Sequence, residues 1–191
     1  MTTTSTRFDM VHDCQRLFRL ILYAVANPGV WVDYLDIVGK FEKNGLLMPL
    51  LLTLCDTEAG YWLRDCPASL TQEVAMLCGA TEKPLEDAGF IFVTNADAPH
   101  DVLRQARPGS FFDPHDSATV FVLLPHCDAT IEQEISGPGV PPDGRVIELP
   151  RDALPWLRAR REMALEYPLG VDLVLVHPEG RLLGLPRTTK G

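Results

Sequence analysis

Apolar residues recur every three or four positions in two stretches of the chain, 9–26 and 152–166, which predicts a helix in each. Asp9 is placed to cap the first helix, and Asn27-Pro28-Gly29 provides a strong stop. Pro155 is tolerated in the first turn of the second helix. Further helices are expected at 45–55, which is almost wholly apolar and should be buried on most sides, at 71–78 and, as a helical turn, at 102–106.

The apolar stripes of the two clear helices should face the core. Arg16 and Arg19 lie off the middle of the first stripe, so we expect both to be solvated. The first stripe comprises Met10, Val11, Cys14, Leu17, Phe18, Ile21, Leu22 and Val25, and the second comprises Trp156, Leu157, Met163 and Ala164.

Short apolar and β-branched runs bounded by turn residues predict the strands, and the clearest is 118–124. The runs around 171–176 and 182–185 flank His177-Pro178-Glu179-Gly180, which predicts a hairpin. Helices and strands interleave, yet at least two adjacent strand pairs look like hairpins. The sequence therefore predicts an α/β fold with a mixed β-sheet flanked by helices. The other strands are expected at 30–38, 61–63, 90–93, 129–135 and 146–149.

A length of 191 residues suits one domain, 1–191, of which residues 1–8 form a polar tail expected to be disordered. No apolar stretch has the eighteen residues of a membrane span, and the N-terminus lacks the apolar region of a signal peptide. We therefore expect a cytoplasmic protein with no membrane partner. The net charge of −9 argues against a nucleic-acid partner, whereas thirteen arginines against four lysines leave room for local anion pockets.

Several common sites are unsupported, and we expect neither a metal nor a cofactor. The five cysteines contain no C-x-x-C pair, and the loop acids and histidine at Asp113, His115 and Asp116 supply at most part of a metal-ligand set. Gly137-Pro138-Gly139 lacks the third glycine of a dinucleotide fingerprint. Each of the four lysines lies in a polar or terminal context that is unsuited to a Schiff base.

The end of the last strand carries the candidate site, for which the catalytic residues stay unknown. Arg187, Thr188 and Thr189 could hold a phosphate or carboxylate, because a guanidinium offers a planar fork of donors and the hydroxyls add more. Asp172 or Asp56 would orient the arginine. The alternative is that Arg187 pairs with an acid such as Asp172 while the threonines continue the strand.

Seven stretches, in order along nearly the whole chain, together resemble the PhnH family, subunits of the bacterial carbon-phosphorus lyase system for using phosphonates. The two near the C-terminus are the most specific as a pair. Where the family commonly shows Arg-Phe-His-Thr-Gly-Ala, this chain has Ala75-Met76-Leu77-Cys78-Gly79-Ala80, so it lacks that arginine and histidine. The matching stretches are 18–19, 27–29, 51–56, 109–119, 136–140, 167–172 and 185–189.

The resemblance implies a fold similar to the large domain of pyridoxal-phosphate transferases but without the cofactor. It implies a homodimer that joins PhnG, PhnI and PhnJ, with PhnL associated, in the conversion of ATP and an alkylphosphonate to ribose 1-phosphonate 5-triphosphate with release of adenine. PhnI would be the catalytic subunit and this chain an accessory one, whose arginines, Arg19 among them, can assist an anionic ligand. A stand-alone binder of a phosphonate or nucleotide anion, or another metabolic protein of similar fold, stays open as an alternative.

Overall fold

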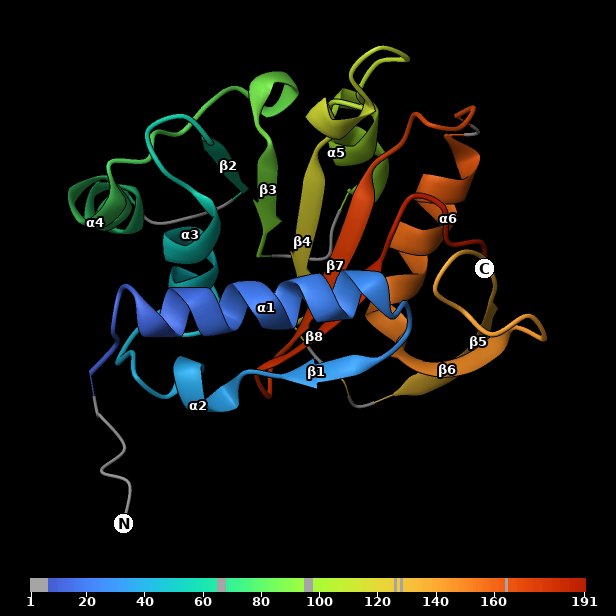
Figure 1. The fold of residues 1–191 in the computed structure, drawn as a ribbon, viewed down its shortest axis with the longest axis horizontal. Helices are drawn as coiled ribbons and strands as arrows, with labels where there is room; N and C mark the ends of the chain where they lie inside the picture. Colours follow the sequence, from blue (N-terminus) through green and yellow to red (C-terminus); the bar gives the residue numbers. More distant parts are fainter. Residues whose placement is uncertain (1–6, 65–67, 95–97, 126, 128, 164) are drawn as a thin grey trace.

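Six of the short apolar runs pair into one mixed β-sheet (Figure 1). This computed structural model describes residues 7–64, 68–94, 98–125, 127, 129–163 and 165–191. The strands are β1 (Trp31–Asp33), β2 (Tyr61–Arg64), β3 (Phe90–Val93), β4 (Thr119–Leu123), β5 (Thr130–Ile135), β6 (Arg145–Pro150), β7 (Asp172–His177) and β8 (Arg181–Leu185). The sheet has the order β1-β8-β7-β4-β3-β2, and β5 and β6 form a separate antiparallel pair. Strands β2, β3, β4 and β7 are parallel, while β8 is antiparallel to both β7 and β1.

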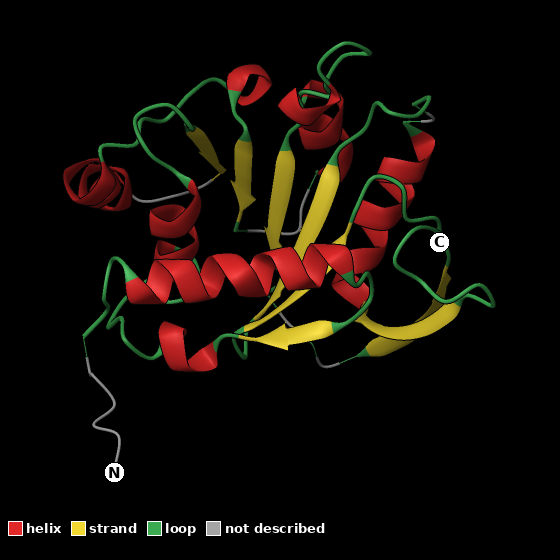
Figure 2. Cartoon of the chain, in the orientation of Figure 1, coloured by secondary structure: helices red, strands yellow, loops and turns green. Residues whose placement is uncertain are grey.

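Helices cover both faces of this sheet, which gives the molecule three layers (Figure 2). They are α1 (His12–Ala26), α2 (Leu35–Val38), α3 (Met48–Leu54), α4 (Ala68–Cys78), α5 (Pro99–Gln105) and α6 (Leu154–Glu162), with short 3-10 turns at η1 (Leu85–Asp87), η2 (Pro114–Asp116) and η3 (Arg151–Ala153). Side chains of α1, α3 and α4 form the core on one face. Those of α5, α6 and the β5–β6 pair form the core on the other.

The central strands are buried on both faces because successive side chains of a strand point to opposite sides. In β4, Val120 and Val122 pack with α5 and α6, whereas Phe121 packs with α1 and α3. Phe92 of β3 stacks on Phe121 with ring centroids 4.9 Å apart. A strand with two buried faces reads as a continuous apolar run, which is why β3, β4 and β7 stand out in the sequence.

The predicted mixed sheet flanked by helices is confirmed, as is the C-terminal hairpin, in which β7 and β8 pair with Leu173 opposite Leu185. The strand predicted at 30–38 is wrong in its second half. There β1 ends at Asp33, whose carboxylate accepts a hydrogen bond of 2.8 Å from the backbone N–H of Leu35. That side-chain contact turns the backbone, and α2 follows.

The predicted helix 152–166 is too long. The chain forms η3 and then α6, with Pro155 in the first turn as expected, and α6 ends at Glu162. Pro168 disfavours helical backbone at the residue before it, and the chain leaves the helix before reaching it. Other boundaries shift too: α3 begins at Met48, α4 at Ala68 and α5 at Pro99. Ala164 and the first six residues of the polar tail lie outside the described residues.

The buried face of α1 differs from the predicted stripe. Asp9 accepts hydrogen bonds from the N–H groups of Val11 and His12, as expected of a capping residue, although the regular helix begins at His12. Asp13 is 6% exposed and receives the ammonium of Lys40 at 2.7 Å. Burial opposes the charge of Asp13, but the N–H of Asp9 and the Lys40 ammonium together lower its pKa below the usual value. Four members of the predicted stripe are exposed: Met10, Val11, Phe18 and Leu22.

Within the described part of the chain, none of the helices combines the length and the apolar character that crossing a lipid bilayer requires.

Candidate anion-binding site

Arg187 and Asp172 form a largely buried ion pair at one edge of the sheet. Asp172 is the first residue of β7, and Arg187 follows the end of β8. The carboxylate accepts hydrogen bonds from the backbone N–H of Arg187 at 2.7 Å, from Nε at 3.2 Å and from Nη2 at 2.7 Å. The two side chains are 17% and 20% exposed. The interpretation that Arg187 pairs with Asp172 is thus confirmed.

The rest of the Arg187 guanidinium joins neighbouring loops. Nη1 donates to the carbonyl oxygens of Pro114 at 2.9 Å and Pro168 at 3.3 Å, and Nη2 also donates to Oγ of Ser117. An arginine side chain has five N–H donors, and all five have acceptors here. In this arrangement Arg187 fixes the positions of three segments and has no unused donor.

The two threonines that follow differ in their surroundings. Thr188 is partly exposed, whereas Thr189 is 5% exposed and its hydroxyl has no hydrogen-bond partner among the described residues. The Thr189 backbone is fixed, because its N–H donates to the Pro186 carbonyl at 2.8 Å. The structure therefore brings Asp172, Arg187, Thr188 and Thr189 together at this edge.

Asp56 and Arg19 lie elsewhere. Both belong to the α1 and α3 layer, on the other face of the sheet from α6. The exposed Asp56 carboxylate accepts hydrogen bonds from the N–H groups of Ala59 at 2.7 Å and Glu58 at 2.8 Å, and these bonds lower its pKa. Arg19 is exposed on α1. The structure does not place either residue beside Arg187.

A cavity of about 410 Å³ opens next to the ion pair, between α6 and the segment after β8. That volume lies within the range of small-molecule sites. The C-terminal segment runs beside α6 in Figure 1. The residues that line the cavity are Leu157, Arg160, Arg161, Met163, Leu165, Leu169, Gly170, Val171, Arg187, Thr189, Lys190 and Gly191.

Arg160 lines the cavity and binds the segment after β8 through its guanidinium. Its Nη1 donates to the carbonyl oxygens of Leu185 and of Pro186, the latter at 3.2 Å, and Nη2 donates to that of Thr189 at 3.1 Å. Loss of water around the guanidinium lowers the pKa of Arg160 to about 10, although the nearby Asp172 charge acts in the opposite direction. Arg160 stays protonated at neutral pH and holds the segment after β8 against α6.

Sequence reasoning missed Arg160, Arg161 and Lys190. A signal existed for Arg160, because it follows Trp156 by four positions and Leu157 by three, and both are buried. Residues at these spacings share a helix face, so Arg160 belongs to the inward face of α6. Arg161 and Lys190 carry no comparable pattern.

Other candidate clusters stay incomplete. Among the described residues, no group of three His, Cys, Asp or Glu side chains is placed to hold a metal ion. His115 and Asp116 are exposed in η2, with Nε2 of the histidine 3.9 Å from the carboxylate. Cys14, Cys55, Cys78 and Cys127 are free thiols, and Cys66 lies outside the described residues.

Four of the seven segments that carry the family resemblance meet around this edge, namely 109–119, 136–140, 167–172 and 185–189. Ser136 and Lys190 exchange two backbone hydrogen bonds of 2.8 Å, which ties 136–140 to the end of the chain. An added Cβ on Gly137 would lie 2.7 Å from the Thr188 carbonyl oxygen, so the close approach requires glycine there. Through Arg187, the stretches 109–119, 167–172 and 185–189 are in direct contact.

Fold and site together define an α/β protein with a cationic cavity between α6 and the segment after β8, beside the amino end of β7. The chain belongs to the PhnH family: the model for bacterial phosphonate metabolism protein (PhnH) matches residues 6–191. It is 28% identical over 175 residues to HtxG of Stutzerimonas stutzeri, a protein described provisionally as a C-P lyase subunit, and the match covers 92% of this chain and 84% of HtxG. The resemblance predicted from the sequence is confirmed, and it places the chain in bacterial phosphonate metabolism.

Proposed function

We propose that this chain is an accessory subunit of a carbon-phosphorus lyase core complex. In that role it supports the conversion of ATP and an alkylphosphonate to ribose 1-phosphonate 5-triphosphate with release of adenine, together with PhnG, PhnI, PhnJ and PhnL. The observation that carries the proposal is the family match over residues 6–191. The provisional description of HtxG as a C-P lyase subunit supports it. The proposal includes a cytoplasmic location, one domain and a fold like that of pyridoxal-phosphate transferases without the cofactor.

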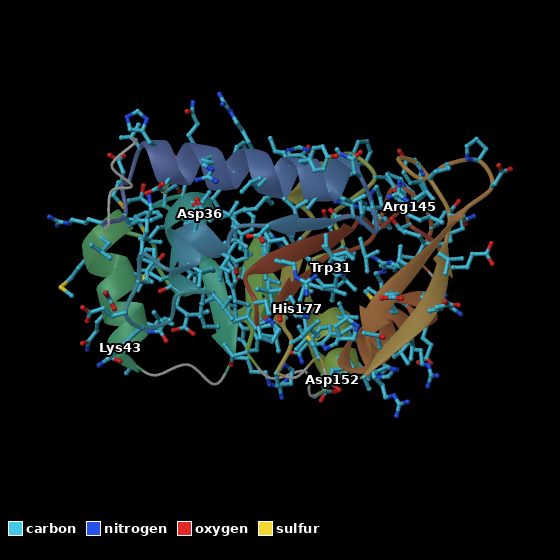
Figure 3. The ribbon with its side chains drawn as sticks, turned by 90° about the horizontal axis from the view of Figure 1, so that it is seen from below. Trp31, Asp36, Lys43, Arg145, Asp152 and His177 are labelled. Carbon is cyan, nitrogen blue, oxygen red and sulfur yellow. The ribbon has the colours of Figure 1, made fainter. Side chains whose placement is uncertain are left out.

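An exposed apolar surface on α1 supports docking to other subunits. Phe18 and Leu22 are four positions apart, so they lie on one side of α1, and the exposed Val11 immediately precedes the helix; we call these three residues the outer stripe of α1. Side chains of α1 project away from the rest of the protein in Figure 3. Large apolar side chains gathered on one exposed helix face are typical of protein interfaces. In this proposal the outer stripe contacts a partner subunit.

Replacing Phe18 and Leu22 together by serine should prevent stable association with the partner subunits. The wild-type chain, co-expressed with PhnG, PhnI and PhnJ from the same source, should elute with them in stoichiometric amounts on size-exclusion chromatography. The double variant should elute apart from them while it keeps the wild-type circular dichroism spectrum.

The pair Met76 and Leu77 offers a matched control, because both are exposed apolar residues on a different helix, α4. Serine at these two positions should leave co-elution unchanged. Loss of co-elution in the α4 variant alone would contradict docking through α1, and a wild-type chain that elutes without the other subunits would contradict the subunit proposal itself.

A second function, binding of a phosphonate or nucleotide anion by the isolated chain, is favoured by the cationic cavity. In the form suggested by the sequence, Arg187, Thr188 and Thr189 bind the anion, Asp172 or Asp56 orients the arginine and Arg19 assists. The saturated hydrogen bonding of Arg187 favours a positioning role for that residue, and the separation of Asp56 and Arg19 from it favours the other cavity residues as the donors.

A further inference from the structure

Two loops at one edge of the sheet carry the three most exposed aromatic side chains of the described residues. Phe111 and Phe112, the phenylalanine pair, are 61% and 95% exposed, and Tyr167 is 75% exposed. Loop 109–117 leads into β4, and loop 165–170 leads into β7, its parallel neighbour (Figure 1). Large apolar side chains gathered at the surface are typical of protein interfaces.

Loop 109–117 is fixed by its own hydrogen bonds. The Ser110 N–H donates to the Asp113 carbonyl oxygen at 3.2 Å, and the Asp113 N–H donates to Oγ of Ser110 at 2.9 Å. Gly109 closes the loop with a φ of +79°, and an added Cβ there would lie 2.9 Å from the Pro114 carbonyl oxygen. The phenylalanine pair therefore stands on an ordered loop, so little conformational entropy is lost when the pair binds a partner.

The second loop is held against the first. Nη1 of Arg187 donates to the carbonyl oxygens of Pro114 at 2.9 Å and Pro168 at 3.3 Å, one in each segment. The Gly170 N–H donates to the Pro108 carbonyl oxygen at 2.9 Å. The two loops consequently form one surface, which we call the aromatic edge.

The charged side chains of the aromatic edge are acidic. Asp113, Asp116 and Glu166 are all exposed, and neither 109–117 nor 165–170 contains Lys or Arg. The imidazole of His115 lies 3.9 Å from the Asp116 carboxylate. Interfaces bring opposite potentials together, so these carboxylates fit a surface with Lys or Arg side chains.

The same charges argue against two other kinds of occupant. A second copy docked through this edge would face it with like charges, because a two-fold interface brings a patch against itself. An anionic lipid surface attracts Lys and Arg, which the two loops lack. A different protein of opposite charge is the occupant that the charges favour.

We propose that the aromatic edge docks onto a partner protein by inserting the phenylalanine pair into an apolar pocket whose rim carries Lys or Arg side chains. Buried aromatic residues commonly dominate the binding free energy of an interface, and a polar rim excludes water around them. The inference rests on the proposed function for the partner, another subunit of the complex. It gives the chain a second docking surface besides the outer stripe of α1.

The test is displacement of a fluorescently labelled wild-type chain from the complex co-expressed with PhnG, PhnI and PhnJ of the same source. Unlabelled full-chain variants are the competitors, and circular dichroism checks their fold. Phe111→Ser with Phe112→Ser should need a half-displacing concentration about thirtyfold that of wild type, the effect of losing an aromatic hot spot. Serine at Met76 and Leu77, adjacent exposed apolar residues of α4, is the matched control and should displace like wild type.

A second double variant tests the acidic rim. Asp113→Lys with Asp116→Lys should raise the half-displacing concentration about tenfold. The difference from wild type should shrink between about 0.1 M and about 1 M salt, as the screening length falls from about 10 to 3 Å. Glu132→Lys with Glu148→Lys is the control, because these exposed residues lie opposite each other on β5 and β6. An equal effect of this control would mean non-specific repulsion and would overturn the acidic rim.

The outcomes separate the docking site from the subunit role. Displacement by the phenylalanine variant at the wild-type concentration would overturn the docking site and leave the subunit role intact. A wild-type chain absent from the co-expressed complex would overturn both, since the partner comes from that role. Conversion of the isolated chain from dimer to monomer by the two phenylalanine substitutions, with displacement unchanged, would assign the edge to a second copy and overturn the proposal.

Discussion

Replacement of Arg187 by methionine is expected to lower the free energy of unfolding by about 3–5 kcal/mol, the range found when one partner of a buried ion pair is removed. The substitution removes the ion-pair partner of the Asp172 carboxylate and the donor that the carbonyl groups of Pro114 and Pro168 share. Urea denaturation followed by circular dichroism measures the change.

Arg16 supplies a matched control, since its pair with Asp36 lies on the surface with both side chains about half exposed. Exposed pairs contribute little, so Arg16→Met should change stability by no more than about 1 kcal/mol. The double variant Arg187→Met with Asp172→Asn should recover part of the lost stability, because the unpaired charge is gone. If Arg187→Met unfolded at the same urea concentration as Arg16→Met, the structural role assigned to Arg187 would be wrong.

Gly184→Ala should destabilise the protein by about 3 kcal/mol, at the upper end of the usual effect of adding atoms to a packed interior. Gly184 lies in β8, where α1 crosses the sheet, and an added Cβ would lie 2.5 Å from the Ala24 carbonyl oxygen and 2.8 Å from the Val25 Cα. Both are backbone atoms of α1, so the helix itself would have to move. The same urea titration measures the effect.

Gly39 provides the comparison for this variant, because it has ordinary helical backbone and its added Cβ would approach nothing closer than 3.5 Å. Gly39→Ala should therefore stay within about 0.5 kcal/mol of wild type, as most surface substitutions do. Equal stability of the two alanine variants would contradict the close packing of α1 on β8.

The sheet could be predicted from the sequence because its central strands are buried on both faces. The run Phe90-Ile91-Phe92-Val93 corresponds residue for residue to β3, and the clear run at 118–124 contains β4. The C-terminal hairpin followed from two apolar runs and a Pro-x-Gly turn. Local patterns suffice where burial is continuous and the turn residues are adjacent in sequence.

Local patterns failed where the decisive partner lies far along the chain. Nothing near Asp13 indicates that it is buried, because the ammonium that compensates it belongs to Lys40, 27 positions away. Asp13 therefore occupies a position on the buried face of α1 that the apolar pattern did not predict. In the same way, the carbonyl groups that occupy Arg187 belong to Pro114 and Pro168, and a backbone acceptor has no signature in the sequence.

The candidate site was foreseen only in part. The sequence indicated Thr189 and the pairing of Arg187 with Asp172. Both follow from features that can be recognised in the sequence, a strand end rich in hydrogen-bond donors and an acidic residue within an apolar strand. It gave no reason to choose Arg160 among the neighbouring arginines Arg158, Arg160 and Arg161 of α6 except its spacing from Trp156. Cavity residues that come from separate segments become apparent only when the chain is folded.

The most direct test of the subunit role is to measure adenine release from ATP and methylphosphonate by purified PhnG, PhnI, PhnJ and PhnL from the same source, with and without this chain. We predict that ribose 1-phosphonate 5-triphosphate and adenine form at an appreciable rate only when the chain is present. An undiminished rate of adenine release in its absence would contradict the proposed subunit role.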